Sequence, residues 1–148
     1  MKFGDFPKVS VEVTMNQGVI VRSRLFLSDA FRCTGGNATL LEWIALYAKR
    51  IPHSLALTNG TTFQSEVMEA LQQIPLGKTI SYQELALLCH RPRAARAVGN
   101  ACNQNPFPLF VPCHRVIRSN GDLGGFAIDI EIKQRLLEFE GALVGKAV

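Results

Sequence analysis

Hydrophobic and polar residues alternate with a period of two near the beginning of the chain. Val9–Val13 reads V-S-V-E-V, the turn residues Asn-Gln-Gly follow at 16–18, and a second run rich in β-branched residues covers Val19–Leu27. Such alternation predicts strands with one buried face, and two such runs around a short turn predict a β-hairpin. We expect Ser28–Gly36 to be a loop.

An amphipathic helix is predicted after this loop. Asn37 can cap it, and its apolar stripe consists of Leu40, Leu41, Ile44 and Tyr47. The stretch 51–60 contains Pro52 and ends in Asn59-Gly60, which favours a link between two lobes.

The second half of the chain has the 3.6-residue period of helices. Behind a capping-box pattern at Thr61–Gln64, one apolar face is formed by Phe63, Val67, Leu71 and Ile74. A second capping-box pattern at Ser81–Glu84 begins another helix, which we expect to run to Cys89.

A tight turn, His90-Arg91-Pro92, separates that helix from the segment RAARAVGNAC at 93–102. Two short helices around such a turn indicate a helix-turn-helix. The second helix has few bulky side chains, and Arg93 and Arg96 share one of its faces. A helix of this kind can approach a nucleic-acid groove closely, or it can pack closely against another helix.

The charge pattern favours nucleic acid. The formal net charge is +4, but no Asp or Glu lies between Leu85 and Gly121. The same stretch holds five arginines, namely Arg91, Arg93, Arg96, Arg115 and Arg118. Concentrated positive charge without local acids is typical of a protein with a polyanionic partner, although it also occurs on solvated basic faces.

The last third of the chain predicts a short buried strand and a terminal helix. Prolines at 106, 108 and 112 hold the backbone extended around Leu109–Val111, and Cys113 follows directly. Glu131–Glu140 has helical spacing and is followed by Gly141. The predicted fold class is α+β, with a small N-terminal lobe of hairpin and helix over 1–60. A mostly helical, winged-helix-like lobe with a helix-turn-helix is predicted over 61–148.

The four cysteines, Cys33, Cys89, Cys102 and Cys113, do not suggest a disulfide framework or a zinc site. No apolar run is long enough to span a membrane, and the first residues lack the core of a signal peptide, so we expect a cytoplasmic protein. Disulfides are rare there, and neither C-x-x-C nor a spaced pair of histidines is present. We therefore expect neither a metal nor a cofactor, and we interpret three of the cysteines as buried hydrophobic residues.

Cys113 differs from the others because His114, Arg115 and Arg118 follow it. Neighbouring cations lower the pKa of a thiol from about 8.5, which favours the nucleophilic thiolate. In a regular strand residues 113 and 114 would point to opposite faces, so the pair requires a turn or a bridging water. A carboxylate behind the imidazole would complete a proton relay, but sequence spacing does not identify it.

The sequence around this cysteine resembles one known family. PCHRVI, preceded by NPFPLFV and followed by SNGDLGGFA, is similar to the active-site signature of the O6-alkylguanine-DNA alkyltransferases. The similarity continues through TTFQSEVMEALQQIPLGKTISYQELA, RAARAVGNA and LLEFEGA, and so covers roughly residues 61–141. The first sixty residues fit the family only by length and by their hairpin-helix pattern.

The resemblance implies DNA repair by direct reversal. An alkyl group on O6 of guanine, with O4-alkylthymine as a further candidate, would pass irreversibly to Cys113 after the base is flipped out of the duplex. His114 would act as the base through a water, and Glu140 would orient it. Asn105 would brace the turn at the active site, and Tyr82 would assist protonation of the departing guanine.

The same resemblance implies how DNA would bind. Arg96 would fill the space left by the flipped nucleotide, and Arg93, Ala95 and Arg115 would add further DNA contacts. The base pocket would include Val116, Phe126 and Ala127. The family binds double-stranded DNA through the minor groove, and we expect a monomer, associated with the nucleoid if the protein is bacterial.

Two departures from the family pattern stand out. Phe126 occupies a position where tyrosine is frequent, and Ile128-Asp129 replaces two glycines. Some relatives bind a structural zinc in the N-terminal lobe, but this chain offers only Cys33 and His53 there, so we expect none.

Two other functions compete with alkyl transfer. A non-catalytic sensor of alkylated DNA would lack the cysteine, so the presence of Cys113 argues against it. A cysteine-histidine hydrolase or acyltransferase would leave the arginine-rich stretch without a purpose.

Overall fold

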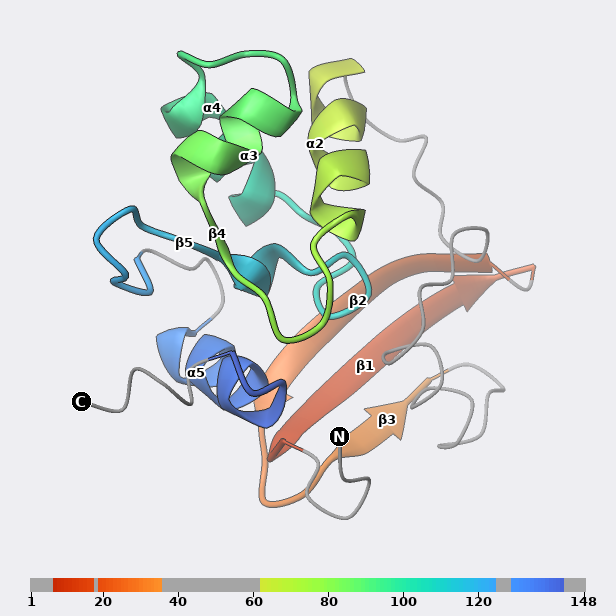
Figure 1. Ribbon diagram of the computed structural model, residues 1–148. Coiled ribbons are helices and arrows are strands. Elements are labelled where there is room, and N and C mark those ends of the chain that lie inside the picture. Colours follow the sequence, from red (N-terminus) through yellow and green to blue (C-terminus); the bar gives the residue numbers. More distant parts are fainter. Residues whose placement is uncertain (1–6, 18, 36–61, 125–128, 143–148) are drawn as a thin grey trace.

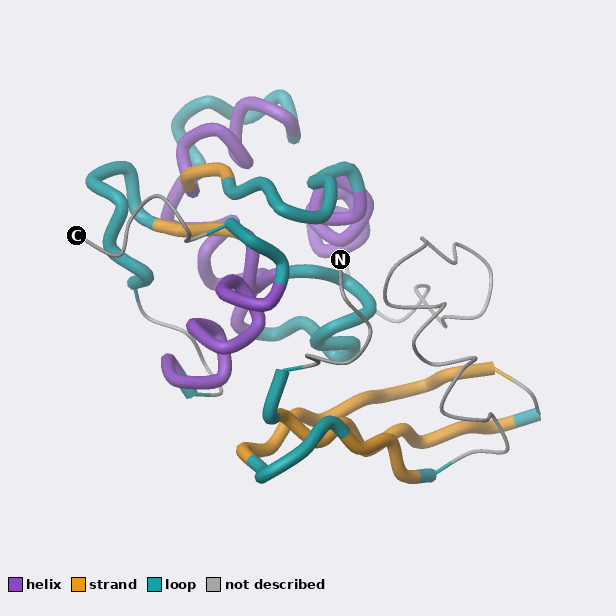
Figure 2. Tube along the Cα trace, turned by 60° about the horizontal axis from the view of Figure 1, so that its bottom comes forward, coloured by secondary structure: helices purple, strands orange, loops and turns teal. Residues whose placement is uncertain are grey.

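The computed structural model describes residues 7–17, 19–35, 62–124 and 129–142. Within these ranges the chain forms a three-stranded sheet, a two-stranded sheet and several helices, so the predicted α+β fold class is confirmed (Figure 1). Figure 2 shows the three-stranded sheet on one side of the molecule and most of the helices on the other. The predicted helix after Asn37 and the predicted link over 51–60 lie outside the described residues.

The hairpin forms where the alternating pattern predicts it. Strands β1 (Val9–Asn16) and β2 (Val19–Leu27) pair antiparallel, with Val9 opposite Leu27. The inward side chains of the hairpin are buried: Val9, Val11, Val13, Ile20, Ser23 and Leu25. The apolar face of the alternation therefore faces the core.

A third strand occupies part of the predicted loop. Strand β3 (Arg32–Thr34) pairs parallel with β1, so the prediction of a loop over Ser28–Gly36 is wrong at these residues. Three residues are too few for a periodic signal, and only the neighbouring strand reveals the pairing. Gly35 follows with φ of +81°, and a Cβ added there would lie 2.0 Å from the carbonyl oxygen of Val13.

The predicted helix-turn-helix is present. Helix α2 (Thr62–Gln72) precedes it, and α3 (Tyr82–Leu88) and α4 (Ala95–Asn103) form it. Ser81 Oγ accepts a hydrogen bond from the Glu84 N–H, and the Glu84 carboxylate accepts one from the Ser81 N–H, both at 3.0 Å. The predicted capping box therefore sets the start of α3.

The proline-rich segment 105–112 does not form the predicted strand. Leu109–Val111 lies in turns, and Leu109 has φ of +81°. Prolines cannot donate the N–H groups that a strand ladder needs, which explains the difference. The segment leads into a 3₁₀ turn, η1 (Cys113–Arg115), and then into β5 (Val116–Ile117), which pairs parallel with β4 (Ile80–Ser81).

The last helix, α5 (Ile130–Phe139), begins after Asp129, whose side chain accepts a hydrogen bond from the Glu131 N–H at 2.7 Å. Gly141, with φ of +78°, follows it as predicted. Helix α5 contacts both β1 and β2, and it also contacts η1. A single hydrophobic core therefore joins the sheet to the C-terminal helices.

None of the helices in the described residues has the length and apolar character needed to cross a membrane.

Candidate active site

Cys113 is the first residue of the η1 turn. Its N–H donates to the carbonyl of Val111 at 2.8 Å, and the N–H of Arg115 donates to the carbonyl of Pro112 at 3.0 Å. Cys113 is 4% exposed and His114 is fully buried. Because the chain turns here, the strand geometry that would hold the two side chains on opposite faces does not apply.

Glu140, the residue after α5, supplies the carboxylate behind the imidazole. His114 Nε2 lies 2.6 Å from Glu140 Oε2, and both side chains are fully buried. Burial alone would raise the pKa of Glu140, but the charge and hydrogen bond of His114, with those of Arg115, outweigh it and lower the pKa to about 2. The carboxylate is therefore ionised and can only accept a hydrogen bond from the ring.

This arrangement fixes which nitrogen of His114 can act as a base. Since Nε2 must carry the hydrogen that Glu140 accepts, Nδ1 keeps its lone pair in the neutral ring. Nδ1 is buried and has no hydrogen-bond partner among the described residues. It is therefore the atom of the pair that can receive a proton.

Arg115 corrects one prediction. It was expected to contact DNA, but it is only 7% exposed. Its Nε donates to Glu140 Oε1 at 2.7 Å, and its Nη1 donates to the carbonyl of Ile74 at 2.9 Å. Because its guanidinium is held inside the protein by Glu140, Arg115 neutralises that carboxylate and is not presented to a ligand.

Asn105 ties the two ends of the proline-rich segment together. Its Nδ2 donates to the carbonyl of Val111, and its Oδ1 accepts from the N–H of Phe107, both at 2.8 Å. Val111 O also accepts the N–H of Cys113. Asn105 therefore lies one hydrogen-bonded group away from the backbone of the cysteine, in agreement with a bracing role.

The thiol of Cys113 does not have the lowered pKa that its neighbours in sequence suggested. Burial raises the pKa of Cys113, and a hydrogen bond from Asn105 and the charge of Lys133 oppose this without outweighing it. The expectation was wrong because Arg115 is engaged with Glu140 and the thiol is removed from water. At neutral pH the resting thiol is protonated and needs a base.

Lys133 is a residue of the site that the sequence reasoning missed. It is fully buried on α5, and its Nζ donates to the carbonyls of Val116 at 2.5 Å and Leu123 at 2.7 Å. Burial lowers its pKa to about 8, although the nearby thiols of Cys113 and Cys102 act in the opposite direction. A signal existed, because Lys133 lies on the apolar stripe of α5 and seven residues before Glu140.

Tyr82, the first residue of α3, lies next to this lysine. The Lys133 ammonium is 6.0 Å from the centre of the Tyr82 ring, which also packs against Gly99 of α4. Burial, with a smaller contribution from the Cys102 and Cys113 thiols, raises the pKa of Tyr82 to about 12. The phenol therefore keeps its proton at neutral pH.

The exposed face of the helix-turn-helix carries two free cations. Arg93 and Arg96 are exposed, and neither has a partner in the parts of the chain that the structure describes. Ala95, the first residue of α4, lies between them and is half-buried. The opposite face of α4 packs into the core through Val98, Ala101 and Cys102. One face of this small-residue helix therefore packs into the core, and the other presents the two arginines to solvent.

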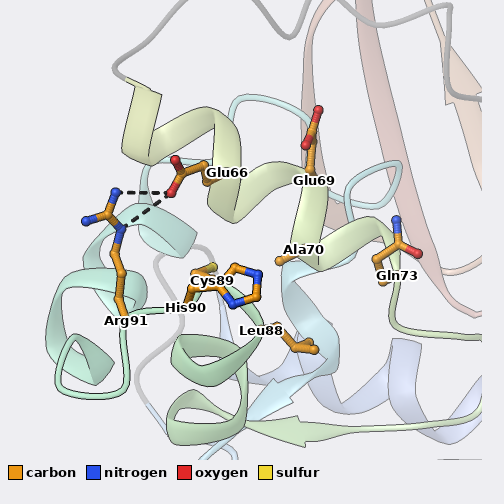
Figure 3. Close-up of a pocket in the computed structure, with 8 residues that line it drawn as sticks. All are labelled: Glu66, Glu69, Ala70, Gln73, Leu88, Cys89, His90 and Arg91. Carbon is orange, nitrogen blue, oxygen red and sulfur yellow. Dashed lines mark hydrogen bonds and ion pairs between the residues drawn. The ribbon is translucent and has the colours of Figure 1, made fainter.

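Arg91 is held by the protein. Its Nη2 and Nε donate to Glu66 Oε2 at 3.2 and 3.4 Å, and its guanidinium lies 5.2 Å from the centre of the Phe63 ring. Glu66 and Arg91 line a cleft of about 600 Å³ between α2 and the turn of the helix-turn-helix (Figure 3). This cleft contains none of the predicted site residues, so it is separate from the candidate active site.

The predicted base pocket is described only in part. Val116 is fully buried in β5, and its carbonyl accepts a hydrogen bond from Lys133. Phe126, Ala127 and Ile128 lie outside the described residues.

The fold and the site together define a helix-turn-helix protein with a buried cysteine, histidine and glutamate at its centre. The family described as 6-O-methylguanine DNA methyltransferase, DNA binding domain, matches residues 62–142, which is more than half of the chain. The chain therefore belongs to this family, as its motifs indicated.

Relatives within the family match the same region. The methylated-DNA–protein-cysteine methyltransferase of Methanosarcina acetivorans is 51% identical over 83 residues, which are 56% of this chain and 53% of that protein. The one from Salmonella typhimurium is 51% identical over 87 residues, 59% of this chain and 51% of that protein. The chain thus matches about half the length of these relatives.

Solved structures match more of the chain. Mycobacterium tuberculosis OGT, solved in complex with DNA, has a TM-score of 0.73 and 31% identity, over 90% of this chain and 93% of that one. The O6-methylguanine-DNA methyltransferase from Pyrococcus kodakaraensis has a TM-score of 0.69 at 24% identity, over 90% of this chain and 99% of that one. The three-stranded sheet, which the sequence motifs did not cover, is therefore part of the shared fold.

Proposed function

We propose that this protein repairs alkylated DNA by direct reversal, taking the alkyl group from O6-alkylguanine onto Cys113. The observation that carries the proposal is the buried His114–Glu140 pair, 2.6 Å apart, with the buried Cys113 directly before His114 in the same turn. Family membership and the similarity to an OGT solved with DNA support DNA as the partner. The names of the relatives support methyl as the group transferred.

The first chemical step is removal of the thiol proton. Because the pKa of Cys113 is raised, the thiol is protonated until a base acts on it. Nδ1 of His114 takes the proton, directly or through a water, and the ring becomes an imidazolium. Glu140, ionised and hydrogen-bonded to Nε2, stabilises that positive charge.

The second step is displacement at the alkyl carbon. The Cys113 thiolate attacks this carbon, the S–C bond forms, and the C–O6 bond breaks with its electron pair left on guanine. Tyr82 holds its proton because its pKa is raised to about 12, so it can donate to the departing base. The product is a thioether, which the site has no chemistry to reverse, so each molecule reacts once.

Access to the lesion requires base flipping, because O6 of guanine is enclosed in the duplex. In this proposal Arg96 enters the base stack, and Arg93 and Ala95 lie along the DNA backbone. The exposure of both arginines and the small side chains of α4 support this assignment. Binding through the minor groove by a monomer is part of the same proposal, as are Phe126 and Ala127 in the base pocket and a cytoplasmic location.

Intact-protein mass spectrometry tests the proposal. After mixing with duplex DNA that contains one O6-methylguanine, the protein should gain the mass of one methylene, located on the peptide with Cys113. Cys113→Ser should show no gain. Cys102→Ser, which alters a buried thiol nearby, should still react. A parent protein without the gain, or with the gain on another residue, would contradict the proposed function.

A further inference from the structure

Ser23 makes two hydrogen bonds from the N-terminal sheet to the proline-rich segment. It lies on β2, which is an edge strand because the order in the sheet is β2-β1-β3. On the free edge of that strand, the N–H of Ser23 donates to the carbonyl of Pro106 at 2.9 Å and its Oγ donates to the carbonyl of Pro108 at 2.8 Å. Ser23 is only 3% exposed, so both bonds are shielded from water.

The two prolines flank Phe107, whose backbone is hydrogen-bonded to Asn105 and Val111. Phe107 is 1% exposed. Its N–H donates to Asn105 Oδ1 at 2.8 Å, and its carbonyl accepts the N–H of Val111 at 2.9 Å. Ser23 therefore holds the backbone on both sides of the residue that Asn105 and Val111 contact.

The connection ends at the cysteine. The carbonyl of Val111 accepts both the side-chain N–H of Asn105 and the N–H of Cys113, each at 2.8 Å. Ser23 is therefore connected to Cys113 by a series of hydrogen bonds, joined only by the peptide bonds between neighbouring residues. In the same proline-rich segment Leu109 has φ of +81°, a conformation that a residue other than glycine keeps only when its surroundings enforce it.

Ser23 occupies a position where the strand pattern calls for an apolar residue. Its inward-facing neighbours on β2, Ile20 and Leu25, are 1% and 4% exposed. A buried hydroxyl costs free energy unless it is hydrogen-bonded, so its place on this face is explained by the carbonyl of Pro108. Proline-rich backbone cannot complete a ladder with β2, and a side-chain donor supplies the second bond.

We propose that Ser23 is a positioning residue for alkyl transfer: through Pro106 and Pro108, the N-terminal sheet sets the place of the Cys113 turn against the flipped base. The inference rests on the proposed function of Cys113. The three-stranded sheet lies outside residues 61–141, which carry the family motifs. According to this inference, the sheet nevertheless affects the rate of alkyl transfer.

The test compares single-turnover methyl transfer in Ser23 variants, at saturating O6-methylguanine duplex and far below the melting temperature. Ser23→Ala removes only the hydroxyl, and it should slow transfer by about tenfold to a hundredfold, as small misplacements of reacting groups do. DNA affinity should not change. Ser10→Ala on β1 is the matched control and should react like the parent.

A second pair of variants separates the hydroxyl from side-chain volume. Ser23→Thr and Ser23→Val have the same shape, and only threonine can donate to Pro108. Transfer should be retained in Ser23→Thr and slowed in Ser23→Val. If Ser23→Ala does not fold, the transfer rates of Ser23→Thr and Ser23→Val decide the question. If both of these larger side chains are too bulky, the comparison of the parent with Ser23→Ala decides it.

The outcomes are distinct. A parent that transfers no methyl group overturns the proposed function and this inference with it. A parent that transfers methyl, with Ser23→Ala equally fast but lower in melting temperature, shows that Ser23 only stabilises the fold and overturns the inference alone. Slower transfer in Ser23→Ala and Ser23→Val, with Ser23→Thr and Ser10→Ala like the parent, supports it.

Discussion

Glu140 lies 2.6 Å from the imidazole of His114 through one carboxylate oxygen, and its other oxygen accepts the Nε–H of Arg115 at 2.7 Å. All three side chains are buried. The same carboxylate therefore orients the base of the site and neutralises a buried guanidinium. Its removal should affect both reaction rate and stability, and the two effects can be measured separately.

Glu140→Gln should slow methyl transfer by about a hundredfold or more, the range typical of a lost proton-transfer relay. Arg115 would be left buried without its counter-charge, which typically costs about 3–5 kcal/mol of folding free energy. Single-turnover kinetics and urea unfolding measure the two effects. Glu138→Gln, an exposed neighbour on α5, is the control and should change neither. DNA affinity should be unaltered, and a fully active Glu140→Gln would rule out the relay.

The stability contributed by Glu140 should depend on pH in a defined window. Its pKa is lowered from 4.5 to about 2 in the folded protein, so the unfolded chain binds the proton first on acidification. The contribution is present above pH 4.5 and is lost as the pH falls towards 2. At about 1.4 kcal/mol per pKa unit this amounts to roughly 3 kcal/mol. The measured quantity is the difference in unfolding free energy between the parent and Glu140→Gln; a difference that does not shrink over this window would contradict the assignment.

Lys133 should give a pH dependence of the same sign in a higher pH window. Its pKa is lowered from 10.5 to about 8 on folding, so the unfolded chain binds more protons between these values and stability should rise with pH there. Lys133→Met should lack this rise, whereas Lys78→Met, at an exposed position, should keep it.

Lys133→Met should also slow methyl transfer, because the carbonyls of Val116 and Leu123 lose their donor beside the base pocket. Rates measured at equal DNA occupancy test this. A variant with the parent rate would restrict Lys133 to a structural role.

The two exposed arginines should differ in what they contribute. Arg96→Ala should impair repair of duplex DNA more than reaction with the free alkylated base, because only the duplex requires extrusion of the nucleotide. Arg93→Ala should weaken binding and reduce the slope of log affinity against log salt by about one, as expected for a phosphate contact. Equal losses on duplex and free base for Arg96→Ala would exclude an intercalating role.

The sequence predicted those elements whose signals are local. The alternation of Val9–Val13 and the capping box at Ser81–Glu84 were sufficient for the hairpin and for α3. The motif around Cys113 identified the family, and with it Glu140, which lies 26 positions away from His114 and has no local signal.

Features set by tertiary contacts could not be predicted in the same way. Strand β3 exists because β1 is beside it. The predicted strand at Leu109–Val111 does not form because the prolines around it cannot donate to a strand ladder, and Ser23 bonds to the carbonyls of Pro106 and Pro108 instead. Arg115 looked like a DNA contact because sequence cannot distinguish a charge on the surface from one buried against Glu140. Burial likewise raised the pKa of Cys113 where charge alone predicted the reverse.

Titration with O6-methylguanine duplex is the most direct test of the central claim that Cys113 is an irreversible acceptor. With labelled methyl groups in excess, transfer should plateau at one methyl per protein molecule, and a second portion of DNA should yield no further transfer. Peptide mapping should find the label on Cys113. Transfer that continues past one equivalent, or a label that leaves the protein again, would contradict the account.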